Sequence, residues 1–154
     1  EYTNVLNSTF GSSMQYVAKE IVPNFQVKDE VEKNIWLSDY QGKVVHISFW
    51  ASWCAPCLKS FRESFLARQQ LQKMGVVLLN INMDKTEPEW RQALFRENIQ
   101  GINVFPVDIS EMRERFKVLA LPFYLTVDKN GQRSYLSTSD LNVAQRDLLE
   151  LMRE

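Results

Sequence analysis

The feature that most constrains this chain is a pair of cysteines, Cys54 and Cys57, which stand two residues apart directly after an apolar run. The run, residues 44–51, is β-branched and aromatic, which predicts a largely buried strand. From Leu58 onward, apolar residues recur at helical spacing between charged ones and predict an amphipathic helix. The free N–H groups and the macrodipole at the start of a helix favour an anion. The cysteines are therefore expected at a strand-to-helix turn that suits reversible dithiol chemistry, with Cys54 as the thiolate.

Cys57 fits the role of the resolving thiol. It lies one helical turn from Cys54 and is placed to release a mixed disulfide by intramolecular attack. The alternatives for the pair are weaker. A closed zinc site needs four ligands, and besides carboxylates the chain offers only His46. Covalent haem needs a histidine where Leu58 stands, a structural disulfide would close a very short loop, and a peroxidase needs a threonine-rich approach that is absent from the sequence.

Length and charge set the broad class. The 154 residues, 45% of them hydrophobic, are enough for one domain with a sizeable core. The 18 basic and 19 acidic residues nearly cancel, which argues against binding to nucleic acid or to an anionic membrane surface. No apolar run approaches the roughly 20 residues that span a bilayer. The start at Glu1 rather than Met leaves open a removed signal peptide, lipid anchor or upstream domain.

Periodicity along the chain predicts an N-terminal extension, residues 1–22, followed by one larger domain, residues 23–154. In the extension, residues 14–21 have the spacing of a short helix that ends before Pro23. The further expected strands are 25–27, 35–37, 44–51, 75–82, 123–127 and 134–136. The first two are expected to form a hairpin, and the last two a hairpin with its turn at residues 128–131. The further expected helices are 58–74, 86–98, 111–118 and 140–153. Short connections and right-handed crossovers then predict an α/β fold, in which a twisted mixed sheet carries helices on both faces.

The spacing of apolar and aromatic residues predicts which side chains are buried. The first long helix is expected to bury Phe61, Phe65, Leu66, Leu71 and Met74, and the second Trp90, Leu94 and Phe95. Trp53 is expected to shape the surface around Cys54, whereas Trp36 and Trp90 are expected in packing.

Four segments, in this order along the chain, carry a family resemblance. They are Pro23-Asn24-Phe25, Leu37-Ser38-Asp39-Tyr40-Gln41-Gly42-Lys43, Ser48-Phe49-Trp50-Ala51-Ser52-Trp53-Cys54-Ala55-Pro56-Cys57, and Leu121-Pro122-Phe123 before Asp128-Lys129-Asn130-Gly131. With them the chain resembles the thioredoxin superfamily, and within it the extracytoplasmic TlpA/ResA-like thiol–disulfide oxidoreductases. The resemblance covers about residues 23–150.

The resemblance implies a thioredoxin fold, no metal, and no cofactor other than a redox-active disulfide between Cys54 and Cys57. It also implies a cis Leu121–Pro122 bond facing the cysteines, where the Leu121 backbone can pair with an extended substrate. An ordinary trans proline at the start of a strand is the alternative. The expected substrate-binding residues are Trp53, Ala55, Pro56, Leu121 and Pro122, with Phe123 as a further candidate for an apolar groove.

In function, the resemblance implies an enzyme that reduces protein disulfides outside the cytoplasm, in the periplasm or cell envelope. It would serve cell redox homeostasis and cytochrome c biogenesis. A membrane or soluble electron donor would restore the dithiol, and a tether upstream of Glu1 would hold the protein at the membrane.

The sequence departs from the family at two positions that usually carry a proton acceptor. Ser48 stands where thioredoxins have a buried aspartate, and Ser60 stands where many ResA-like members have a glutamate. Deprotonation of Cys57 is then expected to rely on water, with His46 and Glu63 as the alternatives. Resolution at neutral pH should be slower than in thioredoxin and dependent on pH.

Two other functions remain open. One is a non-catalytic binding module that recognises partners or carries a soft metal such as Cu(I) on its thiolates. The other is the opposite direction of electron flow, a disulfide oxidase or isomerase, which the Ala55-Pro56 dipeptide does not exclude.

Overall fold

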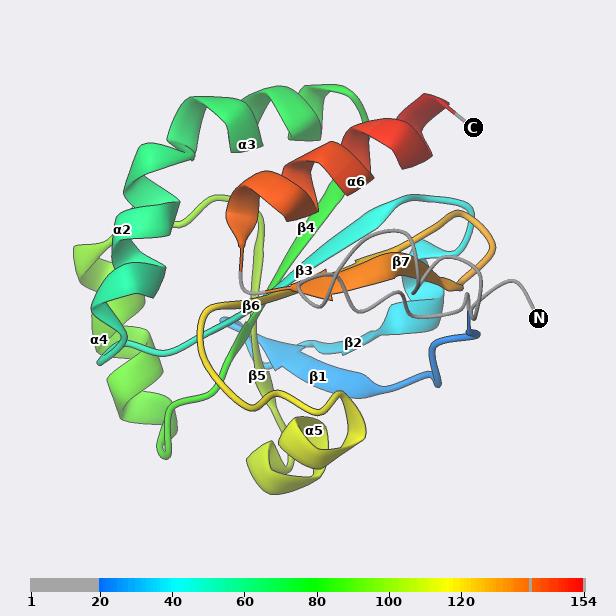
Figure 1. The fold of residues 1–154 in the computed structure, drawn as a ribbon. Helices are drawn as coiled ribbons and strands as arrows, with labels where there is room; N and C mark the ends of the chain where they lie inside the picture. Colours follow the sequence, from blue (N-terminus) through cyan, green and yellow to red (C-terminus); the bar gives the residue numbers. More distant parts are fainter. Residues whose placement is uncertain (1–19, 139, 154) are drawn as a thin grey trace.

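The computed structural model describes residues 20–138 and 140–153, and within them the strands form one seven-stranded sheet (Figure 1). The strand order is β2-β1-β5-β4-β3-β6-β7. The strands are β1 Gln26–Asp29, β2 Asn34–Trp36, β3 Val45–Trp50, β4 Val77–Asn82, β5 Ile102–Pro106, β6 Phe123–Val127 and β7 Arg133–Thr138. The helices are α2 Ala55–Glu63, α3 Phe65–Lys73, α4 Glu87–Arg96, α5 Ile109–Arg115 and α6 Leu141–Arg153, with a 3-10 turn at Leu37–Tyr40.

The sheet is mixed. β4 pairs in parallel with β3 on one side and β5 on the other, and every other neighbouring pair is antiparallel. In Figure 1, α3 and α6 lie on one face of the sheet and α5 on the other. The predicted fold, a thioredoxin-like α/β sheet with helices on both faces, is therefore confirmed, as is the hairpin of β1 and β2.

The two faces of the central strands have different cores. On the α5 side, alternate residues such as Ile47, Phe49 and Ile81 pack with Met112 in the largest apolar cluster. On the other side, Trp50 packs with Phe61 of α2, and a third cluster joins β4, α3 and α6. This alternation follows from the two-residue period of a strand. It fixes which residues lie beneath the helix that carries the cysteines.

The helix predicted from Leu58 to Met74 is wrong in one respect, because it is two helices that meet at Ser64. The Ser64 Oγ donates to the Ser60 carbonyl at 2.6 Å, a back-bond that competes with regular helix geometry. Leu66 and Met74 are 75% and 48% exposed, so they were wrongly assigned to the buried face. Phe65 is half-buried.

Other differences concern weakly patterned segments. The sequence analysis missed β5, which contains Asn103 and ends at Pro106. In α4, Trp90 is buried as predicted and Leu94 is half-buried, but Phe95 is 93% exposed. Trp36, expected in packing, is 43% exposed on an edge strand.

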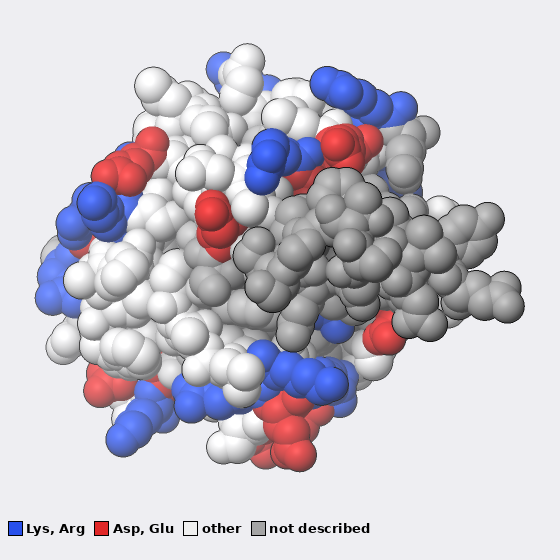
Figure 2. All heavy atoms as spheres, in the orientation of Figure 1, with Lys and Arg blue, Asp and Glu red and all other residues white. Residues whose placement is uncertain are grey.

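The N-terminal helix prediction falls mostly outside the described residues. At its described end, Ile21 forms an isolated antiparallel bridge with Gln132, so this end is not helical. The division at residues 22 and 23 stays a prediction. Within the described part of the chain, no helix has the length and apolarity needed to cross a membrane. On the face shown in Figure 2, acidic and basic side chains are interspersed.

Candidate active site

Cys54 and Cys57 are joined by a disulfide at the start of α2. Their Cα atoms are 5.3 Å apart, and the Cys57 N–H donates to the Cys54 Sγ at 3.3 Å. Cys54 is the N-cap residue, and proline follows in the first turn, where no amide hydrogen is needed. The predicted strand-to-helix position of the pair is confirmed. A thiolate at Cys54 would face the N–H groups of this first turn.

The turn before the cysteines is anchored to the loop after β4. The Asp84 carboxylate accepts hydrogen bonds from the Ser52 N–H at 3.0 Å and from the Ser52 hydroxyl at 2.9 Å. Asn82 donates to the same carboxylate at 2.9 Å, and Asp84 is fully buried. The sequence analysis missed Asp84, which follows the last residue of β4 by two positions. Ligands of open α/β sheets bind beyond the carboxyl ends of the strands, so this position was a signal for a polar site residue. Asp84 therefore holds the active-site turn at the end of the sheet.

The structure shows where the predicted substrate-binding residues lie, and their role in binding stays a prediction. Trp53 is 67% exposed, and Ala55 and Pro56 are exposed beside it. The Leu121–Pro122 bond is cis, as the resemblance implied, and Leu121 packs against the cluster that contains both cysteines. These contacts bring Leu121 to the disulfide, and they leave Trp53 free to contact another molecule.

Phe123 is not part of this surface. Its ring lies 6.0 Å from that of Phe49, on the opposite face of the sheet, where it packs against the α5-side core. The strand period turns its side chain away from α2, because β6 begins at Phe123. Phe123 is half-buried, and its part in an apolar substrate groove stays a prediction.

A groove of about 810 Å³ lies next to the cis-proline segment, between the loop after β4 and helix α5. It is lined by Met83, Lys85, Ile109, Ser110, Arg113, Glu114, Lys117, Val118 and Leu119. Three of these residues are basic and one is acidic. Leu119, two residues before Leu121, is 95% exposed. The groove thus combines apolar and cationic groups next to the segment that leads into the cis-proline.

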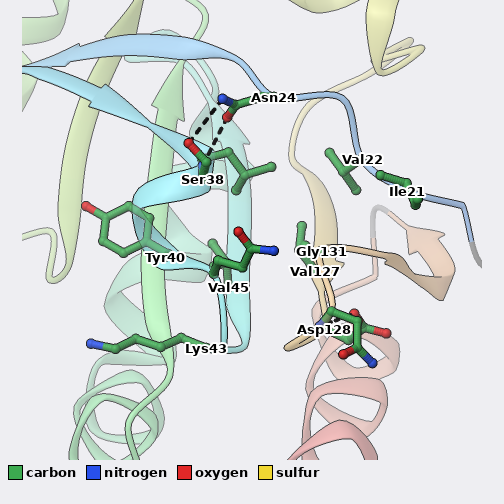
Figure 3. A pocket seen from close by; sticks show the side chains of 13 residues that line it. Ile21, Val22, Asn24, Ser38, Tyr40, Lys43, Val45, Val127, Asp128 and Gly131 are labelled. Atoms are coloured by element: carbon green, nitrogen blue, oxygen red, sulfur yellow. Dashed lines mark hydrogen bonds between the residues drawn. The ribbon is translucent and has the colours of Figure 1, made fainter.

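A second cavity, of about 140 Å³, lies at the opposite end of the sheet (Figure 3). Its wall includes Val45, the first residue of β3, whereas Cys54 follows the last residue of that strand. Strand geometry puts about 17 Å between these two ends. Asn24 and Ser38 close one side by hydrogen bonds of 3.0 and 3.1 Å. This cavity is separate from the redox site.

The two alternative proton acceptors for Cys57 are poorly placed. Glu63 points outward on α2, is 67% exposed and pairs with Lys59 at 3.8 Å. His46 is buried in β3 and stacks on Tyr124 with ring centroids 5.6 Å apart. Burial, aided by the charge of Arg68, lowers the pKa of His46 to about 3. An imidazole with so low a pKa is a weak base, and the expectation that water takes the proton stays a prediction.

The buried histidine makes stability depend on pH. Between about pH 6.5 and 3, the unfolded chain binds a proton at His46 that the folded chain does not bind. The free energy of unfolding should therefore fall as the pH is lowered, by about 1.4 kcal/mol per pH unit from this residue. Urea unfolding of wild type and His46→Gln at several pH values measures the term. Between pH 4 and 6, we expect the free energy of unfolding of the variant to change less steeply with pH, by about 1.4 kcal/mol per pH unit, which corresponds to one proton. Equal slopes for the two proteins would contradict the low pKa of His46.

A disulfide at a helix N-terminus, beside a cis-proline and on a mixed sheet, defines a protein with a thioredoxin-like fold. The AhpC/TSA family matches residues 18–137, and the chain belongs to that family. The thiol-disulfide oxidoreductase ResA of Geobacillus thermodenitrificans is 30% identical over 122 residues, which cover 77% of this chain and 68% of the relative. ResA of Bacillus thuringiensis is 30% identical over 119 residues, and the chain spans 66% of its length.

Solved structures show the same fold. A Chlorobium tepidum protein assigned as the thiol:disulfide interchange protein DsbE superposes with a TM-score of 0.78 and 22% identity, covering 89% of this chain and 99% of that one. A thiol:disulfide interchange protein from Bacteroides sp. also has a TM-score of 0.78, with 17% identity and coverage of 92% and 93%. At these identities the likeness concerns the fold alone.

Proposed function

We propose that this protein reduces disulfide bonds of other proteins by dithiol–disulfide exchange, with Cys54 as the attacking and Cys57 as the resolving thiol. The observation that carries the proposal is the Cys54–Cys57 disulfide at the N-terminus of α2, in one cluster with Leu121 of the cis-proline segment. The names of the relatives support the reaction type.

The reaction balances as two exchanges. The Cys54 thiolate attacks one sulfur of the substrate disulfide, and the other substrate sulfur leaves as a thiolate that takes up a proton. Cys57 then loses its proton and attacks the Cys54 sulfur, which forms the Cys54–Cys57 disulfide and releases the second substrate thiol. The enzyme is oxidised by two electrons, and a separate membrane or soluble dithiol donor restores it.

The surface near the disulfide supports a protein as the substrate. The exposed Trp53 indole and the groove lined by Leu119 both offer apolar area to another molecule. Aromatic side chains of this kind contribute much of the binding energy in protein recognition. The cis-proline segment gives an extended substrate a backbone to pair with.

The setting belongs to the same proposal. We place the activity outside the cytoplasm, in the periplasm or cell envelope, with a tether upstream of Glu1 and with the disulfides of cell-envelope proteins, including apocytochromes, as substrates. No nucleic acid is involved. This rests on the TlpA/ResA-like sequence pattern and on the names of the relatives.

The reduction potential of the Cys54–Cys57 couple, titrated against glutathione and dithiothreitol, tests the direction. We expect a value near or below about −230 mV, as in reducing members of the fold. A value of about −120 to −180 mV would instead identify an oxidase or isomerase. Insulin reduction measured in parallel tests catalysis. If the protein retained Cu(I) stoichiometrically and did not reduce insulin, the enzyme proposal would be refuted, and a metal-carrying binding module would take its place.

A further inference from the structure

The sheet face beneath α2 and α3 is lined with buried polar side chains, in contrast to the apolar face beneath α5. The strand register places Ser48 of β3 beside both Asn80 and Tyr124, and Asn80 beside Asn103. The six side chains of this polar layer are at most 7% exposed. They are His46, Ser48, Asn80, Asn103, Tyr124 and Thr126.

Arg68 of α3 places a cation in this layer. It is 3% exposed, and its Nη2 donates to the Asn80 Oδ1 at 2.7 Å and to the Gln100 carbonyl at 3.1 Å. Its guanidinium carbon lies 5.0 Å from the centre of the Phe61 ring. Among the described residues, no carboxylate pairs with Arg68. Burying a charge without a counter-ion lowers the free energy of unfolding, which suggests that Arg68 is kept for its function.

The cation lies beneath the cysteine helix. Phe61, which the guanidinium contacts, follows Cys57 by one turn of α2, or about 6 Å of helix rise. Ser60 and Tyr124 lie in the same region, with their hydroxyl oxygens 2.7 Å apart. At position 60, where many members of the family have a glutamate, this chain has Ser60. The Ser60 hydroxyl pairs with that of Tyr124, in the region of the buried Arg68.

The other titratable groups around Arg68 do not cancel its charge. On β3, His46 is neutral, and on β6 burial raises the pKa of Tyr124, so its phenol stays protonated. Asp140, just before α6, contributes to the raised pKa of Tyr124, whereas no carboxylate contributes to the shifted pKa of Arg68. Asp147 is buried on α6. Burial lowers the pKa of Arg68 to about 10, which leaves it charged at neutral pH.

The charges on α2 face outward. Lys59 pairs with Glu63, and Arg62 pairs with Glu97, in both cases with one partner or both largely exposed. Water screens such surface pairs, whereas a cation in the dry interior acts over a longer distance. The dominant charge behind Cys57 is therefore positive.

We propose that Arg68 is a positioning residue, whose buried guanidinium stabilises the Cys57 thiolate through the Ser60–Tyr124 hydroxyl pair. In the resolving step the Cys57 proton passes to water, and the cation holds the resulting thiolate ready to attack the Cys54 sulfur. The inference rests on the proposed role of Cys57. It gives the chain an electrostatic substitute for the absent carboxylate.

The test measures the pKa of the lone Cys57 thiol in a Cys54→Ser background, by thiolate absorbance and by the pH dependence of alkylation. We expect Arg68→Gln to raise this pKa by about one unit, which lowers alkylation near neutral pH about tenfold. Arg68→Lys should stay close to the parent because it keeps the charge. The matched control, Arg62→Gln, removes an exposed cation from α2 and should change nothing.

An unchanged Cys57 pKa in a folded Arg68→Gln protein would overturn the inference. If that variant does not fold, Tyr124→Phe decides, because it keeps the ring that stacks on His46 and removes only the hydroxyl. We expect it to raise the Cys57 pKa by about half a unit, and no shift would again overturn the inference. The readout needs no turnover. A protein that fails to reduce insulin but shows the Arg68 effect would refute the proposed function alone.

Discussion

Replacing Cys54 with serine is expected to lower insulin reduction by about three orders of magnitude or more, because a serine hydroxyl is not ionised at neutral pH and cannot form the mixed disulfide. Cys54 is the N-cap of α2, whose first-turn N–H groups stabilise a thiolate there. Turnover is measured by the precipitation of reduced insulin chains. Stability should change little, since serine is a favoured N-cap residue.

Cys57→Ser is the matched variant, and it should fail at a later step. Cys54 still attacks, but no thiol follows to release the product, so a covalent enzyme–insulin adduct should accumulate and disappear on addition of dithiothreitol. Non-reducing electrophoresis and mass spectrometry identify it. Retention of more than a tenth of the activity in Cys54→Ser, or an adduct on Cys57 in the wild type, would contradict the assigned roles.

Gly101→Ala is expected to have the largest effect on stability, a loss of about 3–4 kcal/mol in the free energy of unfolding. Gly101 has φ +106°, and a Cβ there would lie 2.6 Å from the Leu78 carbonyl oxygen and 2.8 Å from the Leu78 Cβ. Both contacts are with the rigid central strand β4. The substitution would also displace the neighbouring Gln100, whose carbonyl accepts hydrogen bonds from Arg68 and Asn80.

Gly42→Ala is the control for this prediction. Gly42 also has a positive φ, +86°, but no atom lies within 4 Å of the position of its Cβ. Only the backbone penalty applies, and we expect a loss of about 1 kcal/mol. Chemical denaturation of both variants separates the backbone penalty, which both share, from the steric contact with Leu78, which only Gly101→Ala makes. Equal losses would show that the contact with Leu78 relaxes without cost.

The sequence was sufficient to predict the parts of the fold that have strong periodicity. The apolar run before the cysteines and the turn at residues 128–131 both gave correct elements. β5 was missed because Asn103 interrupts its apolar pattern and Pro106 ends it. Asn103 is buried, since its side chain bonds with Asn80 and with the Ile99 carbonyl. Such a pairing is visible only once the strands are placed side by side.

In the candidate site, too, local motifs were predictable from the sequence, whereas long-range polar contacts were not. The cysteine motif indicated the disulfide and its place at the helix start, and the resemblance implied the cis bond at Pro122. The sequence pattern alone would place Arg68 on the solvent face, because charged residues on an amphipathic helix are usually exposed. Its burial depends on acceptors from β4 and from the segment before β5, far away in sequence. Long-range polar contacts of this kind leave no periodic signal.

The two cysteines of the sequence are both used in the disulfide at the start of α2. A chain with four cysteines can close its bridges in three ways, whereas a chain with two can close only one. Within these 154 residues, oxidation therefore has no incorrect cysteine pair to form. This segment can reach its native connectivity without the help of an isomerase, and its two thiols report the state of a single redox couple.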